Sequence, residues 1–221
     1  MTHGKWELLG DQGWLGTFAT ESEAAACAAA VRAADWPWVA DVVVAYCSVA
    51  VYCTTPGILP PNAAADLANL KPSPAQSAGR AVTIPCWYDP QSDLPWVAEF
   101  LRLPVAEVIR LHANRWYTVF AIGFVPGFPY LGYLPEELQG VPRLATPRPR
   151  VPAGSVAITG KQTAIYPTDT PGGWRLLGRS PCLLVDVAAG YFPLRTGDRV
   201  RFLPIDEKEY QHRLGERLTG S

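Results

Sequence analysis

The chain of 221 residues carries a formal net charge of −1, with 19 basic and 20 acidic side chains. This balance excludes a general electrostatic attraction to nucleic acid or anionic lipid, so any binding of an anion has to be local. Hydrophobic residues make up 48% and charged residues 18% of the sequence, which is typical of a globular protein with one large or two small domains. The sequence has no long apolar span and no leader-like start, so we expect a cytoplasmic protein without a membrane segment.

Cysteine and histidine give no sign of a metal site. The five cysteines are scattered and include no C-x-x-C pair, so we expect reduced, mostly buried thiols rather than a disulfide framework or a zinc ribbon. His3, His112 and His212 lie too far apart in the sequence to form a local ligand motif.

Residues 1–88 predict a small α+β domain. Two short apolar-rich runs suggest a hairpin, and an alanine-rich helix follows with Thr20 or Ser22 as its N-cap. Runs rich in valine and tyrosine then predict two strands, and a second helix and a closing strand complete the domain. We place the domain boundary near residues 89–93. The expected elements are strands 5–9 and 14–18, helix 24–34, strands 39–46 and 48–52, helix 60–70 and strand 81–85.

Residues 89–221 predict two short helices followed by a mainly β domain. Many short β-type runs divided by glycine and proline turns favour a barrel or a sandwich. The charged tail, residues 207–221, is expected to be peripheral and helical at most. The expected elements are helices 93–100 and 104–111 and strands 116–122, 156–159, 163–166, 174–177, 182–187 and 199–202.

Residues 123–174 interleave glycine, proline, aromatic residues and arginine with short apolar runs. An ordinary helix or strand would instead show an apolar period of about 3.6 or 2. Glycine and proline together constrain the path of a chain, and long ordered loops tend to be functional. We therefore expect a shaped loop that binds a ligand or contacts another subunit. A surface loop packed on itself is the alternative.

Arginine and aromatic residues gather in and beside this stretch. Guanidinium groups pair with carboxylates or phosphates, and aromatic rings form flat apolar walls, so the combination predicts a basic aromatic pocket. Each arginine taken singly could instead be a solvated surface charge. No nucleophile elbow and no carboxylate pair stands out, so the chain alone does not look like a complete hydrolase. The residues concerned are Arg143, Arg148, Arg150, Arg175, Arg179, Phe124, Phe128, Tyr130, Tyr166 and Trp174.

A phosphate-binding loop at residues 154–163 is not expected. Ser155 stands where the first glycine should be, and Gln162 follows Lys161 where serine or threonine is required. The segment after it is strand-like and ends at a proline, so no helix dipole would face a phosphate.

His112 stands at the predicted C-terminal end of a helix, just before the strand that leads into the stretch. An imidazolium would be stabilised at that end of a helix. Helix capping or core packing and catalysis are both open, because one titratable group without a visible partner does not decide between them.

Several motifs together carry a resemblance to a known family. They include GFVPGFPYL at residues 123–131, RVPAGSV at 150–156 and PGGWRLLGR at 171–179, with QT at 162–163 and GDRVRF at 197–202 as smaller matches. The pattern resembles the family of the B subunit of 5-oxoprolinase, also called allophanate hydrolase subunit 1 or the Kip-type sporulation kinase inhibitor. The similarity extends over nearly the whole chain.

The resemblance implies a ferredoxin-like domain over residues 1–88 and a cyclophilin-like β-barrel over residues 89–221. It also implies partners: a larger carboxyltransferase-type subunit, known as allophanate hydrolase subunit 2, and, in the 5-oxoprolinase assembly, a lactam-utilisation subunit. That assembly opens 5-oxoproline to glutamate with ATP. Related domains are fused in urea carboxylase, and one branch of the family inhibits a sensor histidine kinase.

On this interpretation the stretch is a half-site shared with the partner subunit. Arg148, Arg179, Gln162 or Lys161 would hold the carboxylate or a phosphorylated intermediate, and His112 would assist proton transfer. The alternatives are a regulatory protein that inhibits a histidine kinase and a subunit of an allophanate- or urea-processing enzyme. The expected catalytic residue is His112, and the expected pocket residues are Phe124, Pro126, Phe128, Tyr130, Arg148, Ser155, Lys161, Gln162, Thr163, Tyr166, Trp174 and Arg179.

Three departures from the family pattern concern Ala164, where glycine is usual, Val44 with Ala45 before Tyr46, and residues 186–193, which contain no arginine. If the family's arginine contacts the substrate or the partner, its absence would affect activity.

Overall fold

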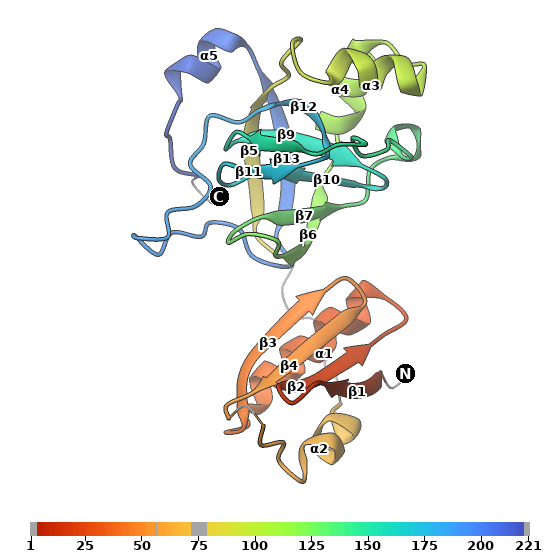
Figure 1. Cartoon of the computed structure of the whole chain (residues 1–221), viewed down its shortest axis with the longest axis vertical. Helices are drawn as coiled ribbons and strands as arrows, with labels where there is room; N and C mark the ends of the chain where they lie inside the picture. Colours follow the sequence, from red (N-terminus) through yellow and green to blue (C-terminus); the bar gives the residue numbers. More distant parts are fainter. Residues whose placement is uncertain (1–3, 56, 72–78, 219–221) are drawn as a thin grey trace. The chain divides into compact units, whose positions relative to one another are not determined.

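The computed structural model describes residues 4–55, 57–71 and 79–218, and the chain divides into two compact units, Met1–Ala78 and Gly79–Ser221 (Figure 1). The predicted boundary after residue 88 is therefore about ten residues too late. Strand β5 (Ala81–Trp87), expected to close the first domain, pairs in parallel with β13 (Arg199–Ile205) of the second. Its sequence predicts a strand, but strand propensity says nothing about a pairing partner far along the chain.

The first unit is an antiparallel four-stranded sheet, in the order β1-β2-β4-β3, with two helices. Thr20 caps α1 as predicted, because its Oγ1 accepts the N–H of Glu23 at 3.2 Å. Alanine and valine side chains of α1 pack against valines of β3 and β4 to form the core. This confirms an α+β domain, while its ferredoxin-like character stays a prediction. The elements are β1 (Lys5–Leu9), β2 (Gly13–Thr17), α1 (Glu21–Ala34), β3 (Val39–Ala45), β4 (Ser48–Cys53) and α2 (Ala63–Asn69).

The second unit contains a closed barrel in the order β10-β7-β6-β13-β5-β12-β9, together with a separate ribbon of β8 and β11. The barrel confirms the mainly β prediction for this part of the chain. Besides β5 and β13, its elements are α3 (Leu94–Leu101), α4 (Val105–Ala113), β6 (Tyr117–Ile122), β7 (Pro129–Gly132), η1 (Glu136–Leu138), β8 (Arg148–Val151), β9 (Ser155–Thr159), β10 (Gln162–Ile165), β11 (Thr170–Gly172), β12 (Arg175–Arg179) and α5 (Glu207–His212).

The strands of the barrel present different side chains to its two faces. Val156 and Ile158 belong to the large core inside the barrel, whereas Ala157 between them belongs to a second apolar cluster. Leu131 and Tyr130 divide in the same way on β7. Successive side chains of a strand point to opposite faces, so the second cluster lies on the outer face of the wall. It contains small alanines and large aromatic rings, and this outer face carries the candidate site.

Helices α3 and α4 lie side by side at one end of the barrel (Figure 1). The tail is less peripheral than predicted, because Leu218 belongs to the barrel core and Tyr210 contacts Trp87 with ring centroids 5.4 Å apart. In the part of the chain that the structure describes, no helix is long and apolar enough to cross a membrane.

Two predictions for the second unit are wrong in detail. Residues 182–187 form only isolated bridges and not a strand. The stretch 123–174, interpreted mainly as shaped loop, contains β7, β8 and β11 in addition to the expected β9 and β10. These extra strands are only three or four residues long and contain proline or glycine, which hides them from any test of apolar period.

The buried carboxylate of Asp198 joins two distant segments of the barrel unit, at Arg80 and Arg195, and should contribute to its stability. Its side chain is 5% exposed, it accepts from the backbone N–H groups of Arg80 and Arg195, and it pairs with the Arg80 guanidinium at 2.5 Å. We predict that Asp198→Ala lowers the free energy of unfolding by about 2–4 kcal/mol, because it leaves these donors without an acceptor. Urea unfolding measures the change.

The matched control is Glu107→Ala, which breaks the surface pair between Glu107 and Arg110 and should leave the unfolding midpoint almost unchanged. An Asp198→Ala protein as stable as the control would contradict the role assigned to Asp198.

Candidate functional site

A pocket of about 380 Å³ lies on the outer face of the barrel, between β7 and the β8–β11 ribbon. Its volume is at the small end of the range for ligand sites, about 300–1,000 Å³. Six of the lining residues belong to the basic aromatic pocket expected from the sequence: Phe124, Phe128, Tyr130, Arg143, Tyr166 and Trp174. The others are Pro147, Thr170, Pro171, Gly172 and Gly173.

Phe128 is the centre of the aromatic wall. It is 2% exposed, and its ring makes edge contacts with Tyr130, Tyr166 and Trp174 at centroid distances of 5.0, 5.1 and 5.9 Å. Edge-to-face contacts place the positive edge of one ring on the negative face of another, and they hold aromatic rings in fixed relative orientations. The pocket wall is therefore preorganised before any ligand arrives.

Two backbone positions of the site are unusual, one in its φ angle and one in how closely it approaches a side chain. Phe124 has a φ of 69° although it is not glycine, and its side chain is 62% exposed at the pocket. Such strained positions cluster at binding sites. At Gly172 a Cβ atom would stand 2.4 Å from the Tyr166 hydroxyl, so any larger residue would displace that hydroxyl.

Tyr166 supplies a neutral polar group. Burial raises the pKa of its hydroxyl above the ordinary value, although a backbone hydrogen bond from Trp174 and the charges of Arg143 and Arg148 act in the opposite direction. The hydroxyl therefore stays protonated at neutral pH and does not bring a negative charge into the pocket.

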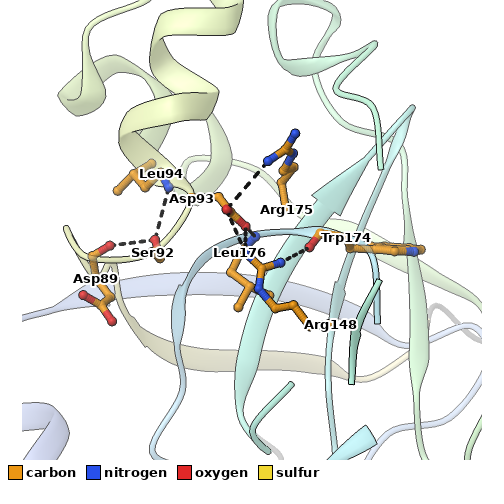
Figure 2. A network of polar contacts seen from close by, with 8 residues as sticks. All are labelled: Asp89, Ser92, Asp93, Leu94, Arg148, Trp174, Arg175 and Leu176. Carbon is orange, nitrogen blue, oxygen red and sulfur yellow. Dashed lines mark hydrogen bonds and ion pairs between the residues drawn. The ribbon is translucent and has the colours of Figure 1, made fainter. Parts of the chain in front are cut away.

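Arg148 does not line the pocket, and instead holds the wall behind it. Its Nη2 donates to both carboxylate oxygens of Asp93 at 2.8 Å, and its Nη1 lies 3.4 Å from the backbone oxygen of Trp174. Asp93 also accepts the N–H of Leu176 at 2.8 Å. Figure 2 shows the carboxylate lying among Arg148, Arg175 and Leu176. The N-cap residue of α3 thus ties the ribbon and the start of β12 together, with Trp174 between them.

Arg175 completes this arrangement from the other side. Its Nη1 lies 3.8 Å from Asp93, and its guanidinium carbon lies 3.5 Å from the centroid of the Trp96 ring on α3. A guanidinium stacked on an aromatic face combines dispersion with a cation–π attraction. Arg175 therefore anchors β12 to α3.

His112 lies inside the barrel and not in the pocket. It is fully buried, its Nδ1 lies 2.7 Å from the Tyr88 hydroxyl, and its Nε2 lies 2.8 Å from Thr163 Oγ1. Thr163 donates its own proton to the Ala157 carbonyl, so Nε2 carries the imidazole proton and Nδ1 accepts from Tyr88. Burial lowers the pKa of His112 to about 3. The imidazole is therefore neutral at pH 7, and of the two interpretations left open by the sequence this placement favours core packing over catalysis.

The other expected residues are scattered around the barrel. Ser155 is buried and donates to the Pro152 carbonyl. Arg179 approaches Asp89 at 3.9 Å. Pro126 belongs to the β6–β7 connection but not to the pocket lining, and Lys161 and Gln162 occupy the β9–β10 turn and the start of β10. The turn is followed directly by strand β10, as the sequence predicts, so no helix N-terminus faces this turn.

Among the described residues there is no group of three or more His, Cys, Asp or Glu side chains that could hold a metal ion. All five cysteines are free and four of them are buried, as expected. Residues 186–193 contain no arginine of their own, but Arg217 of the tail lies 3.4 Å from Asp186 and over the Tyr191 ring.

The sequence did not reveal the part that Asp93 plays in the site, nor did it distinguish Arg143 from the other arginines. Asp93 is separated from Arg148 by 55 positions, and nothing local in the sequence links them. Arg143 was noted only as one of several arginines. The fact that sets it apart is visible only in three dimensions: no ion pair of the described residues includes Arg143.

Comparison with known proteins gives the class to which this fold and site belong. Residues 5–191 match the family described as the carboxyltransferase domain, subdomain C and D, and the chain belongs to that family. The B subunit of 5-oxoprolinase from Escherichia coli O157:H7 is 51% identical over 116 residues, which are 52% of this chain and 53% of that protein. The B subunit of 5-oxoprolinase from Bacillus subtilis is 45% identical over 134 residues, 59% of this chain and 55% of the relative.

The matched region thus spans about half the length of these relatives. Among solved structures, that of TTHA0988 superposes with a TM-score of 0.75 at 38% identity and covers 88% of this chain and 40% of the other. The Kluyveromyces lactis urea amidolyase has the same fold, with a TM-score of 0.73 at 15% identity over 99% of this chain and 16% of the other.

The buried His112 predicts a specific dependence of stability on pH. Its pKa is about 3 in the folded chain and about 6.5 when unfolded, so between these values only the unfolded chain takes up the proton. Stability is therefore complete above pH 6.5 and is lost as the pH falls. We expect a loss of about 2 kcal/mol between pH 7 and pH 5 from this residue.

Urea unfolding at several pH values measures this slope. His112→Gln should lower stability at pH 7 and reduce the slope between pH 7 and pH 5, whereas His212→Gln on the exposed helix α5 should change neither. An unchanged slope in His112→Gln would show that His112 is not the group responsible.

We predict that Asp93 and Arg148 are strongly coupled in their contribution to the free energy of unfolding. In a double-mutant cycle with Asp93→Asn and Arg148→Gln, we expect a coupling of about 1–3 kcal/mol in the free energy of unfolding. The control cycle uses Arg150 and Asp169, a pair on the same ribbon whose side chains are 76% and 42% exposed, and should give a smaller coupling because solvent screens it. Equal couplings would contradict a structural role for Asp93.

Proposed function

We propose that the chain is one subunit of a cytoplasmic, ATP-dependent 5-oxoprolinase, which opens the ring of 5-oxoproline to give glutamate. The observation that carries the proposal is the preorganised aromatic pocket with Arg143 in its lining. A small lactam ring with a carboxylate, such as 5-oxoproline, could pack its ring against the aromatic side chains and place its carboxylate at Arg143. Identities of 45% and 51% to proteins named as the B subunit of 5-oxoprolinase support the proposal.

The pocket supplies binding but little of the chemistry that ring opening requires. Its lining consists of aromatic, proline, glycine and threonine residues with one arginine, and this set offers no carboxylate or imidazole for proton transfer. We therefore assign the remaining groups, and the binding of ATP, to partner subunits. These are a larger carboxyltransferase-type subunit and a lactam-utilisation subunit.

A second candidate is a subunit of an allophanate- or urea-processing enzyme. The description of the family as a carboxyltransferase domain favours it. Both candidates need a half-site that is completed by a partner, and they differ in the amide that enters the pocket.

Reconstitution of the assembly tests the proposal. We expect ATP-dependent glutamate release from 5-oxoproline when this chain is mixed with both partner subunits, and loss of that activity when this chain is omitted. Trp174→Ala should lower activity by at least about tenfold, because it removes a wall of the pocket, whereas Trp116→Ala, beside Arg199 and Arg201, should not.

The same mixture is assayed with urea and allophanate in place of 5-oxoproline. Turnover of these compounds without turnover of 5-oxoproline would favour the second candidate. Equal glutamate release with and without this chain would reject the proposal.

A further inference from the structure

Arg143 differs from the other arginines around the pocket in having no acidic partner. The ion pairs within residues 4–55, 57–71 and 79–218 join each of the other four to a carboxylate, and none of them involves Arg143. A carboxylate that already pairs with a guanidinium reduces its attraction for a further anion. The positive charge of Arg143 is therefore the one left for a ligand. The four pairs are Arg148 with Asp93, Arg175 with Asp93, Arg150 with Asp169 and Arg179 with Asp89.

The position of Arg143 directs this charge into the pocket. It belongs to the lining, and its guanidinium carbon lies 6.0 Å from the centroid of the Trp174 ring. Its positive charge also acts to lower the pKa of the Tyr166 hydroxyl, another group in the lining. The guanidinium thus lies beside the wall formed by Trp174 and Tyr166, and a ligand placed against these rings would contact it.

The rest of the lining limits what the ligand can be. The rings of Phe128, Tyr130 and Trp174 present apolar surface to the pocket, and the hydroxyl of Tyr166 is a neutral donor. A phosphate dianion is usually held by several cations or by a series of backbone N–H groups at a helix N-terminus. One guanidinium among aromatic rings fits a single negative charge on a small ring that packs against aromatic faces.

We propose that the pocket binds a monocarboxylate carried on a small, flat ring, with the guanidinium of Arg143 pairing with the carboxylate and the ring of the ligand packing against the wall that Trp174 and Tyr130 form together. This inference rests on the proposed function, because 5-oxoproline is such a ring acid, and it deepens that function by naming the group that holds the substrate. It also replaces the expectation that Arg148 or Arg179 holds the carboxylate, since both pair with aspartates of the protein.

Binding to the full chain tests the inference directly. Three probes are titrated while the indole N–H signal of Trp174 is followed by NMR: 5-oxoproline, cyclopentanecarboxylate and 2-pyrrolidinone. We expect the two ring carboxylates to bind and to shift this signal, and 2-pyrrolidinone, which lacks the carboxylate, to bind at least about tenfold more weakly. Inorganic phosphate should shift the signal less than either carboxylate at equal concentration.

Arg143→Gln should weaken binding of both carboxylates by at least about tenfold, because it removes a charge-assisted bidentate contact. Arg143→Lys keeps the charge but loses the fork and should be intermediate. Arg150→Gln removes the same charge from strand β8, where Arg150 pairs with Asp169, and should bind like the wild type. Since Arg143 has an exposed side chain, we expect each variant to unfold at the wild-type temperature.

Three results would overturn the inference: no binding of either ring carboxylate to the wild-type chain, equal binding by Arg143→Gln, or equal binding of 2-pyrrolidinone. The KM for 5-oxoproline in the reconstituted assembly separates this inference from the proposed function. An active assembly whose KM is unchanged by Arg143→Gln would reject the role of Arg143 but not the proposed function. Binding of ring carboxylates through Arg143 without turnover of 5-oxoproline would reject the proposed function but not the role of Arg143.

Discussion

The carboxylate of Asp93 is the contact on which the geometry of the site depends. Both of its oxygens accept from Arg148 on the ribbon, and one of them also accepts the backbone N–H of Leu176 on β12. Trp174 lies between these two elements and forms a wall of the pocket. The Asp93 side chain is only 13% exposed and has several charged and neutral donors around it. It is therefore held more firmly than a carboxylate in an exposed surface ion pair. The aromatic wall is therefore fixed from behind, without using a residue that faces the ligand.

The wall of the barrel separates two groups of residues that look alike in the sequence. Thr163 points inward and contacts His112, whereas Ala164, the next residue, packs outward with the aromatic cluster. Inside, polar groups satisfy one another and burial keeps the imidazole neutral. On the outer face, Arg143 forms no ion pair with a carboxylate of the described residues. Only the outer group has the properties of a binding site, and this division supports a barrel that binds its ligand on its surface rather than in its interior.

A pocket that binds without supplying acid or base fits a protein that works as part of an assembly. The solved structure of TTHA0988 is in keeping with this view, because the region similar to this chain makes up 40% of that chain. An exposed apolar residue in the pocket lining, such as Phe124 at 62%, is of the kind that protein contacts cover. The proposed partner would then close the pocket and bring the reacting groups to the bound ring.

The sequence by itself determined most of the element types, the aromatic members of the pocket and the family. These follow from local rules: apolar period, the Thr20 cap, glycine and proline turns, and motifs that are contiguous in the chain. The tertiary structure alone decided that β5 joins the barrel, that His112 is buried, that Asp93 holds Arg148, and that Arg143 forms no ion pair among the described residues. Each of these depends on contacts between residues far apart in the chain, 55 positions for Asp93 and Arg148 and 51 for His112 and Thr163. A charge is neutralised, or an imidazole is desolvated, by neighbours that only the folded chain brings together.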